Sequence, residues 1–263
     1  MHKILILGSD KRSLTVYEIL KEKHYDVSLL TNYEQLKEGF TAYLLPIPAT
    51  LDGVKLNCDL NITVNEILTK AHNDSLIISA GFKKDGIIDI TDNDDFAYQN
   101  AVPTAEGAIS LAIGSNGSTL ADSNILVTGF GRVSKVLLAR LKAFSKNITV
   151  AVRKAGDLSL INALGFNALP VGMLAERLKD FDIIFNTIPY KLFNSETLYN
   201  AKEKAVFIEL ASNASGFDTD YIKALPVTFI NAPGLPAKVA PTSAGKILAE
   251  AVITTLTNSK NIG

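Results

Sequence analysis

Two glycines near the middle of the chain have the spacing of a phosphate-binding loop. Gly129 and Gly131 follow the short apolar segment ILVT and precede residues 132–144, where apolar side chains recur at helical spacing. Glycine lets a backbone turn tightly and approach an anion, and the first turn of a helix offers free N–H groups. The phosphate-binding residues predicted from this pattern are Gly129, Gly131, Arg132 and Val133.

The motif over residues 129–134, G-x-G-x-x-S, matches the dinucleotide-binding fingerprint except at Ser134, where glycine or alanine is usual. A predicted strand precedes the motif, a helix follows it, and a second strand ends about 20 residues later. This context favours a bound dinucleotide. The alternative is a strand–turn–helix that needs glycine only for its geometry.

The end of the strand predicted at 147–152 bears on which dinucleotide binds. NAD-specific folds place an acidic residue there to hold the ribose 2′-hydroxyl, whereas this chain has Arg153 and Lys154. A guanidinium would pair with the 2′-phosphate of NADP. We therefore expect NADP as the cofactor. NAD remains the alternative because Asp157 lies close by in the sequence.

The segment FNTIP, residues 185–189, ends the fourth predicted strand of this half of the chain. In a dinucleotide-binding fold, the carboxyl end of that strand lies beside the nicotinamide ribose. The residues assigned to the cofactor site here are Asn186, Thr187, Ile188 and Pro189. The alternative is a strand that simply ends at a proline turn.

Apolar runs alternate with amphipathic helical segments along the whole chain, which indicates parallel sheets covered by helices on both faces. The first series has strands predicted at 3–8, 25–31, 42–48 and 75–81, with helices at 12–24 and 63–72. The second series has six strands, predicted at 124–129, 147–152, 166–170, 182–189, 205–210 and 227–231.

The expected fold class is α/β with two domains. Residues 1–101 are predicted to form a smaller, parallel, flavodoxin-like domain on the substrate side. Residues 102–241 are predicted to form a Rossmann domain, a doubly wound parallel sheet that binds NAD(P). A helix that begins just after Pro103 is expected to join the two, and the closing segment 242–263 is expected to be helical and could pack on the first domain.

Composition excludes several classes of protein. The 263 residues carry a net charge of −1, so no general attraction to nucleic acid or an anionic membrane is expected. One cysteine, Cys58, and three scattered histidines provide neither a disulfide nor zinc-ligand spacing, so no metal site is predicted. Without a secretory signal or an apolar run of about 18 residues, we expect a cytoplasmic protein.

Several longer segments of the chain are distinctive. The run NAPGLPAKVAPTSAGKILA, residues 231–249, is the most specific of them because it is long and unusual. The others are VTGFGRVSKVLLARLKAF, FNTIP, ELASNASGFD, ILGSDKR, LLPIPAT and NAVPTAEGAI. Together they cover nearly the whole chain in order, and they resemble the A-subunit family of dipicolinate synthase, an enzyme of spore-forming bacteria.

The resemblance implies an NADP-dependent oxidation of a dihydrodipicolinate-type precursor to dipicolinate, which is pyridine-2,6-dicarboxylate. It also implies a partner, the flavoprotein-like B subunit of dipicolinate synthase, and action in the mother cell during sporulation. A homo-oligomer is a further possibility.

A dicarboxylate substrate needs cations or N–H donors in its site. The predicted substrate-binding residues are Arg12 after the first strand, Thr104, and Lys238, which is expected in the loop after the last strand. Asp10 and Glu106 are the candidate catalytic carboxylates, although Asp10 could instead orient Arg12. The alternatives are solvated surface charges for the two cations and, for Glu106, a first-turn carboxylate that the helix dipole favours.

Two other functions remain open from the sequence. One is a generic two-domain NAD(P)-dependent dehydrogenase of a hydroxy or amino acid, although no histidine–carboxylate or lysine pair suited to that hydride chemistry is evident. The other is a non-catalytic chain that senses NADP and regulates its partner.

Overall fold

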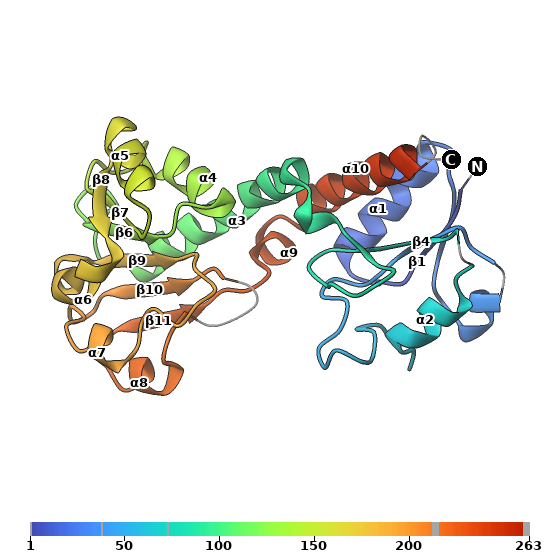
Figure 1. The fold of residues 1–263 in the computed structure, drawn as a ribbon, viewed down its shortest axis with the longest axis horizontal. Helices are drawn as coiled ribbons and strands as arrows, with labels where there is room; N and C mark the ends of the chain where they lie inside the picture. Colours follow the sequence, from blue (N-terminus) through green and yellow to red (C-terminus); the bar gives the residue numbers. More distant parts are fainter. Residues whose placement is uncertain (1, 38, 73, 212–215, 260–263) are drawn as a thin grey trace. The chain divides into compact units, whose positions relative to one another are not determined.

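The computed structural model describes residues 2–37, 39–72, 74–211 and 216–259, which form two compact units (Figure 1). The first unit comprises residues 1–100 together with 240–263, and the second comprises residues 101–239. The first unit is therefore built from both ends of the chain.

The first unit contains a five-stranded parallel sheet in the order β2-β1-β3-β4-β5. Its strands are β1 (Lys3–Ile6), β2 (Asp26–Leu29), β3 (Ala42–Leu44), β4 (Leu76–Ser79) and β5 (Ile88–Asp89). Its shorter helices are α1 (Lys11–Glu22), α2 (Val64–Lys70) and the 3₁₀ turns η1 (Tyr33–Lys37) and η2 (Ile90–Asp92). This is the flavodoxin-like order, with a topological switch point outside the carboxyl ends of β1 and β3.

The last helix, α10 (Pro241–Ser259), lies beside α1 in the first unit (Figure 1). Leu248 and Val252 of α10 share one buried cluster with Val16 and Leu20 of α1. Each fully buried aliphatic side chain of this kind contributes about 1.5–3 kcal/mol. The two helices approach so closely that a Cβ on Gly245 would lie 3.0 Å from the carbonyl oxygen of Arg12.

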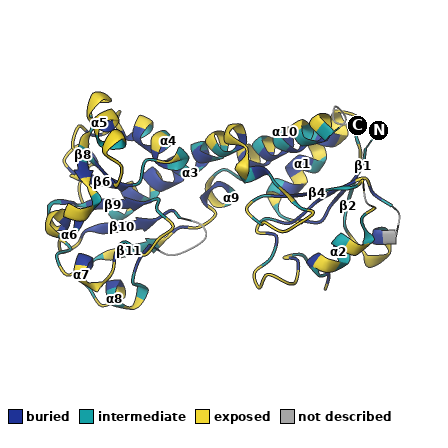
Figure 2. Cartoon of the chain, in the orientation of Figure 1, coloured by how far each residue is buried: buried dark blue, intermediate teal, exposed yellow. Residues whose placement is uncertain are grey.

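The second unit is a six-stranded parallel sheet in the order β11-β10-β9-β6-β7-β8. Its strands are β6 (Ile125–Thr128), β7 (Ile148–Val152), β8 (Asn167–Pro170), β9 (Ile183–Asn186), β10 (Val206–Glu209) and β11 (Thr228–Asn231). This is the doubly wound dinucleotide-binding topology, so the predicted fold class is confirmed, and its switch point lies between β6 and β9. Every residue of β6, β9 and β10 is buried, as the dark blue strands in Figure 2 show.

Helices connect the strands of this second sheet, and one more, α9, follows its last strand. They are α4 (Arg132–Leu141), α5 (Ala155–Ala163), η3 (Val171–Met173), α6 (Leu174–Arg177), η4 (Leu178–Asp180), α7 (Ser195–Leu198), α8 (Thr219–Lys223) and α9 (Leu235–Val239). The closing helix of the chain ends within the described residues at Ser259, so the part of the prediction that covers 260–263 lies outside them.

The helix predicted to begin after Pro103 begins earlier, so that boundary was wrong. Helix α3 runs from Asp94 to Ser115 and contains Pro103. Asn93 caps the start, since its Oδ1 accepts hydrogen bonds from the N–H groups of Asp95 (2.8 Å) and Phe96 (3.2 Å). The cap and the burial of the Phe96 side chain stabilise the helix and so compensate for the hydrogen bond that is lost at the internal proline.

Lys238 was predicted to lie in a loop, and this placement was also wrong. It lies on the short helix α9, where it is exposed. Pro236 stands in the first turn of that helix, where the N–H group that proline lacks is not needed. The sequence favours a loop at this point because two prolines and a glycine occur between residues 233 and 236.

Candidate functional site

The loop between β6 and α4 has the backbone that the fingerprint requires. Gly129 has a φ of +89°, and its N–H donates to the carbonyl of Ala151 at 2.9 Å. A Cβ at Gly129 would lie 2.7 Å from Thr187 Oγ1 and 3.0 Å from Ile188 Cγ1. Only glycine therefore fits both the dihedral angle and the space at this position.

The first turn of α4 has the geometry to receive an anion. Gly131 is the N-cap residue, and no side chain of the described residues caps this helix end. A Cβ at Gly131 would meet no atom within 4 Å. The N-terminus of a ten-residue helix at the carboxyl edge of a parallel sheet is the place where dinucleotide phosphates bind in this fold.

Ser134, which departs from the fingerprint, tightens the same loop. Its side chain is buried, and its hydroxyl donates to the carbonyl of Gly129 at 2.8 Å. The small side chain still lets α4 pack on the sheet. The serine thus fills the third position of the motif with a hydrogen bond that holds the turn closed.

The segment after β9 is tied to the glycine loop. The N–H and hydroxyl of Thr187 both bond to the carbonyl oxygen of Thr128, the hydroxyl at 2.7 Å. Asn186 is completely buried, and its Oδ1 accepts from Thr128 Oγ1 at 2.5 Å and from the N–H of Ile188 at 3.2 Å. The Asn186 amide is therefore engaged within the protein, while Pro189 is exposed.

Glu209, at the end of β10, is a buried carboxylate that the sequence interpretation missed. Its side chain is 1% exposed, and Oε1 accepts from Asn186 Nδ2 at 2.9 Å. Burial raises the pKa of the Glu209 carboxyl, and hydrogen bonds from Ala211, Gly216 and Asn186 offset only part of this effect. An acidic residue that ends the apolar strand AVFIE was the available signal. The neighbouring residues 212–215 of the motif ELASNASGFD lie outside the described part of the chain.

Arg153 and Lys154 are exposed at the carboxyl end of β7, and neither forms an ion pair within the described residues. Lys154 is the N-cap residue of α5, and Asp157 lies in the first turn of that helix. Two cations are thus available where the adenosine ribose lies in this fold, and the nearby carboxylate has a structural role at a helix N-terminus.

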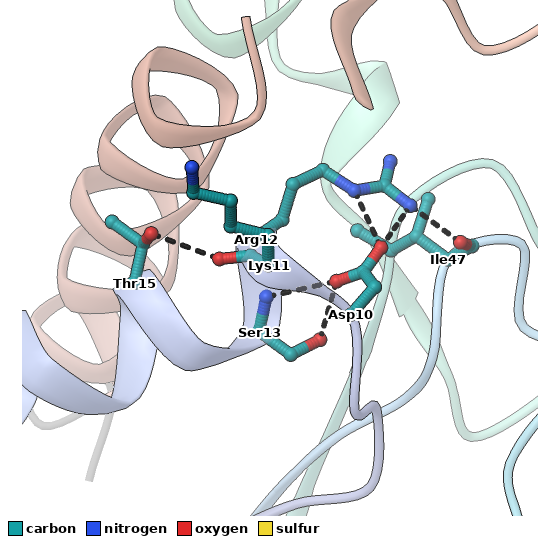
Figure 3. A network of polar contacts seen from close by, with 6 residues as sticks. All are labelled: Asp10, Lys11, Arg12, Ser13, Thr15 and Ile47. Carbon is teal, nitrogen blue, oxygen red and sulfur yellow. Dashed lines mark hydrogen bonds and ion pairs between the residues drawn. The ribbon is translucent and has the colours of Figure 1, made fainter. Parts of the chain in front are cut away.

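In the first unit, Asp10 and Arg12 form an ion pair at the carboxyl end of β1 (Figure 3). Asp10 Oδ2 accepts from Arg12 Nε at 2.7 Å and from Nη2 at 2.5 Å, and Nη2 also donates to the carbonyl of Ile47 at 2.6 Å. Asp10 Oδ1 caps α1 through the N–H of Ser13 at 2.9 Å. The pair thus joins the loops after β1 and β3, at the switch point of this sheet.

The Arg12 guanidinium has one side without a partner. Its Nη1 forms no hydrogen bond in the described structure and points away from Asp10 in Figure 3. The Arg12 side chain is only 12% exposed. An oriented and largely desolvated guanidinium with one side unpaired is suited to bind a carboxylate.

Replacing Asp10 by asparagine is expected to remove a pH-dependent contribution to stability. Burial would raise the pKa of Asp10, but hydrogen bonds from Ser13 and the Arg12 guanidinium outweigh it and hold the pKa below its ordinary value. A lowered folded-state pKa stabilises the fold above the unfolded-state pKa, and this stabilisation is lost as the pH falls through the folded-state value. The Tm values of wild type and Asp10→Asn should therefore differ at pH 7 and converge below about pH 4. A difference that stays constant with pH would contradict the assignment.

The other candidate residues lie in the second unit. Glu106 is exposed on α3, and its Oε1 lies 3.5 Å from Arg140 Nε of α4. Thr104 lies two residues earlier on α3 and is half-buried. Helix α9, which carries Lys238, packs against α3, since a Cβ on Gly107 would lie 3.0 Å from Val239 Cγ2. Three of the predicted residues thus stand on two adjacent helices.

Within the described residues, no group of three or more histidine, cysteine, aspartate or glutamate side chains is placed to hold a metal ion. No helix in the same part of the chain is both long enough and apolar enough to cross a membrane.

The fold and the glycine loop together define a two-domain protein of the dehydrogenase fold. The NAD⁺-bound 3-phosphoglycerate dehydrogenase of Entamoeba histolytica shares this fold, with a TM-score of 0.61 and 14% identity over 96% of this chain and 94% of that one. An identity this low demonstrates the fold alone. No family model matches the sequence.

Nearer relatives identify the family. The A subunit of dipicolinate synthase from Bacillus subtilis (strain 168) is 31% identical over 94% of this chain and 93% of its own length. The crystal structure of the same subunit from Bacillus subtilis superimposes with a TM-score of 0.90 at 26% identity, covering 100% of this chain and 98% of that one. This chain belongs to the A-subunit family of dipicolinate synthase, and the resemblance noted in the sequence is confirmed.

Proposed function

We propose that this chain oxidises a dihydrodipicolinate-type precursor to dipicolinate with NADP, in the mother cell during sporulation. The observation that carries the proposal is the loop at Gly129, where a positive φ and close contact with Thr187 and Ile188 lead into an uncapped helix N-terminus. Membership of the A-subunit family of dipicolinate synthase supports the substrate class. A family named for one subunit of an enzyme supports a second chain, for which we propose a flavoprotein-like B subunit.

The residues present fit a nicotinamide dinucleotide. Gly129, Gly131, Arg132 and Val133 would hold its pyrophosphate at the start of α4, and the segment 187–189 would line its nicotinamide half. Asn186 would support that segment rather than contact the cofactor, because its amide is buried and forms hydrogen bonds with Ile188 and Glu209. The cofactor, when bound, supplies the acceptor for a hydride.

Arg12 is the proposed carboxylate-binding residue of the first unit. Asp10 keeps the guanidinium plane fixed, so the unpartnered Nη1 can bind one substrate carboxylate without a rearrangement. Thr104 and Lys238 are proposed to bind the substrate from the second unit.

Of the two candidate bases, Glu106 suits proton transfer better than Asp10. Both oxygens of Asp10 accept hydrogen bonds from Arg12 or Ser13, and its lowered pKa makes it a weak base. We assign Asp10 to positioning and propose Glu106, whose carboxylate is 61% exposed, as the proton acceptor.

Replacing Arg153 by aspartate is expected to reverse the cofactor preference. The substitution puts a carboxylate where a 2′-phosphate would bind, so NADP affinity should fall by about tenfold to 100-fold while NAD affinity holds or rises. Calorimetric titration of both cofactors into the purified chain measures this. The charge-removing substitution Lys146→Gln, at an exposed residue before β7, serves as a control. An equal loss of affinity for both cofactors would contradict the assignment of Arg153 to the 2′-phosphate.

Ultraviolet absorbance of dipicolinate and of reduced NADP tests the function directly. The purified chain is mixed with NADP and the precursor, alone and together with the second subunit. Product in either mixture supports the proposal. NADP binding without turnover in both mixtures would instead favour a sensing role, and turnover of hydroxy or amino acids alone would favour a generic dehydrogenase.

A further inference from the structure

We propose that Glu209 is a positioning residue that fixes the segment 187–189 for the nicotinamide half of the cofactor and acts through Asn186. This inference rests on the proposed function, since it assigns a role within the same cofactor site. Glu209 itself is buried beneath the loops and touches neither substrate nor cofactor in this assignment.

Among the described residues, the groups that contact the Glu209 carboxylate are hydrogen-bond donors. Oε1 accepts from Asn186 Nδ2 and from the N–H of Ala211, both at 2.9 Å, and Oε2 accepts from the N–H of Gly216 at 2.5 Å. A carboxylate has only acceptors and satisfies all three donors, whereas a glutamine amide would set its NH₂ group against one of them. The surroundings are therefore specific for a carboxylate.

Glu209 determines which way the Asn186 amide faces. With Nδ2 held by Glu209, the same nitrogen also donates to the carbonyl of Ile188 at 3.0 Å, and Oδ1 accepts from the N–H of Ile188 at 3.2 Å. One side chain thus holds both backbone groups of Ile188. A flipped amide would set its oxygen against the Glu209 carboxylate and the Ile188 carbonyl, both of them acceptors, and would release Ile188.

The segment held in this way touches the glycine loop. A Cβ on Gly129 would lie 3.0 Å from Ile188 Cγ1, and the Thr187 hydroxyl donates to the carbonyl of Thr128. The contacts form a continuous chain from β10 through β9 to the loop after β6. These are the strand ends on either side of the switch point, where this fold binds its ligand.

The burial of Glu209 is costly for the fold, which argues for a functional reason. No lysine or arginine pairs with it among the described residues, so only hydrogen bonds compensate for its lost hydration. Apolar strand ends would make a more stable sheet edge. Costly buried carboxylates concentrate at functional sites.

The test compares a whole cofactor with its adenosine half. Calorimetry on the full chain measures the Kd of NADP and of 2′,5′-ADP for wild type, Glu209→Gln and the control Glu203→Gln, an exposed residue in the turn before β10. We expect Glu209→Gln to raise the Kd of NADP at least about tenfold and the Kd of 2′,5′-ADP by less than about twofold. The control should change neither. If both Kd values rise equally, or if neither rises, the inference is overturned and the Glu209 carboxylate has a merely structural role.

Asn186→Ala is the second variant and decides the case if Glu209→Gln does not fold. It leaves Glu209 the two backbone donors, Ala211 and Gly216, but breaks the link to Ile188. It should reproduce the loss that is selective for NADP, and an unchanged ratio of the two Kd values overturns the inference. Wild-type protein that binds neither ligand overturns the proposed function itself, a result distinct from failure of Glu209 alone.

Discussion

Replacing Arg12 by alanine is expected to lower kcat/KM for the dicarboxylate substrate by about 100-fold, mostly through a higher KM. The variant loses a charge-assisted hydrogen bond from a largely desolvated guanidinium, which is worth about 1.5–3 kcal/mol, and the ordered geometry that Asp10 provides. Steady-state kinetics with saturating NADP measures the change. Cofactor affinity should stay the same, because Arg12 lies in the first unit and the glycine loop in the second.

Two further variants show whether the charge or the planar shape of the Arg12 guanidinium is responsible for substrate binding. Arg12→Lys keeps the positive charge but loses the planar fork, so it should recover only part of the activity. Lys11→Ala removes an exposed cation from the adjacent position and should have no effect on KM. An Arg12→Ala enzyme with wild-type KM and an unchanged Tm would rule Arg12 out as the carboxylate-binding residue.

Replacing Gly129 by alanine is expected to abolish measurable cofactor binding and to lower Tm. A φ of +89° costs an L-residue about 1–2 kcal/mol, and the added methyl group would collide with Thr187 and Ile188. Relief of that collision displaces the segment after β9 from the loop. Calorimetry with NADP and thermal unfolding of the same samples measure the two effects.

Gly131→Ala separates the two causes. At this position the φ is −86° and an added methyl group meets nothing, so Tm should hold while cofactor affinity falls because the pyrophosphate can no longer approach. Gly117→Ala, in an open turn, should alter neither property. If Gly129→Ala bound NADP as wild type does, the phosphate-binding assignment of this loop would be wrong.

Much of the fold could be predicted because buried parallel strands are continuous apolar runs. The segments NILVTG and DIIFNTIP are of this kind, and they form the central strands β6 and β9. Strand β5 has two residues, too few for any periodicity. The start of α3 was missed because Pro103 is a strong breaker signal, whereas the Asn93 cap becomes decisive only with Phe96 in the core.

The candidate site was predictable where its signal is local. The glycine spacing over 129–134 needs no knowledge of distant contacts, and Arg153 follows from the end of one strand. Asn186 was expected to face the cofactor, but its hydrogen bonds go to Glu209, 23 residues further along the chain, and to Thr128. No periodicity encodes such a long-range network, so the buried carboxylate emerges only when the three strand ends are seen together.

The return of α10 to α1 has a consequence for biosynthesis. Residues 101–239 form an uninterrupted stretch, so this unit can fold as soon as it leaves the ribosome. Residues 1–100 of the first unit leave the ribosome before this stretch, but they lack Leu248 and Val252 until α10 has also been made. The apolar face of α1 on Val16 and Leu20 therefore stays uncovered while the whole second unit is made, and the first unit completes its core after the second has emerged.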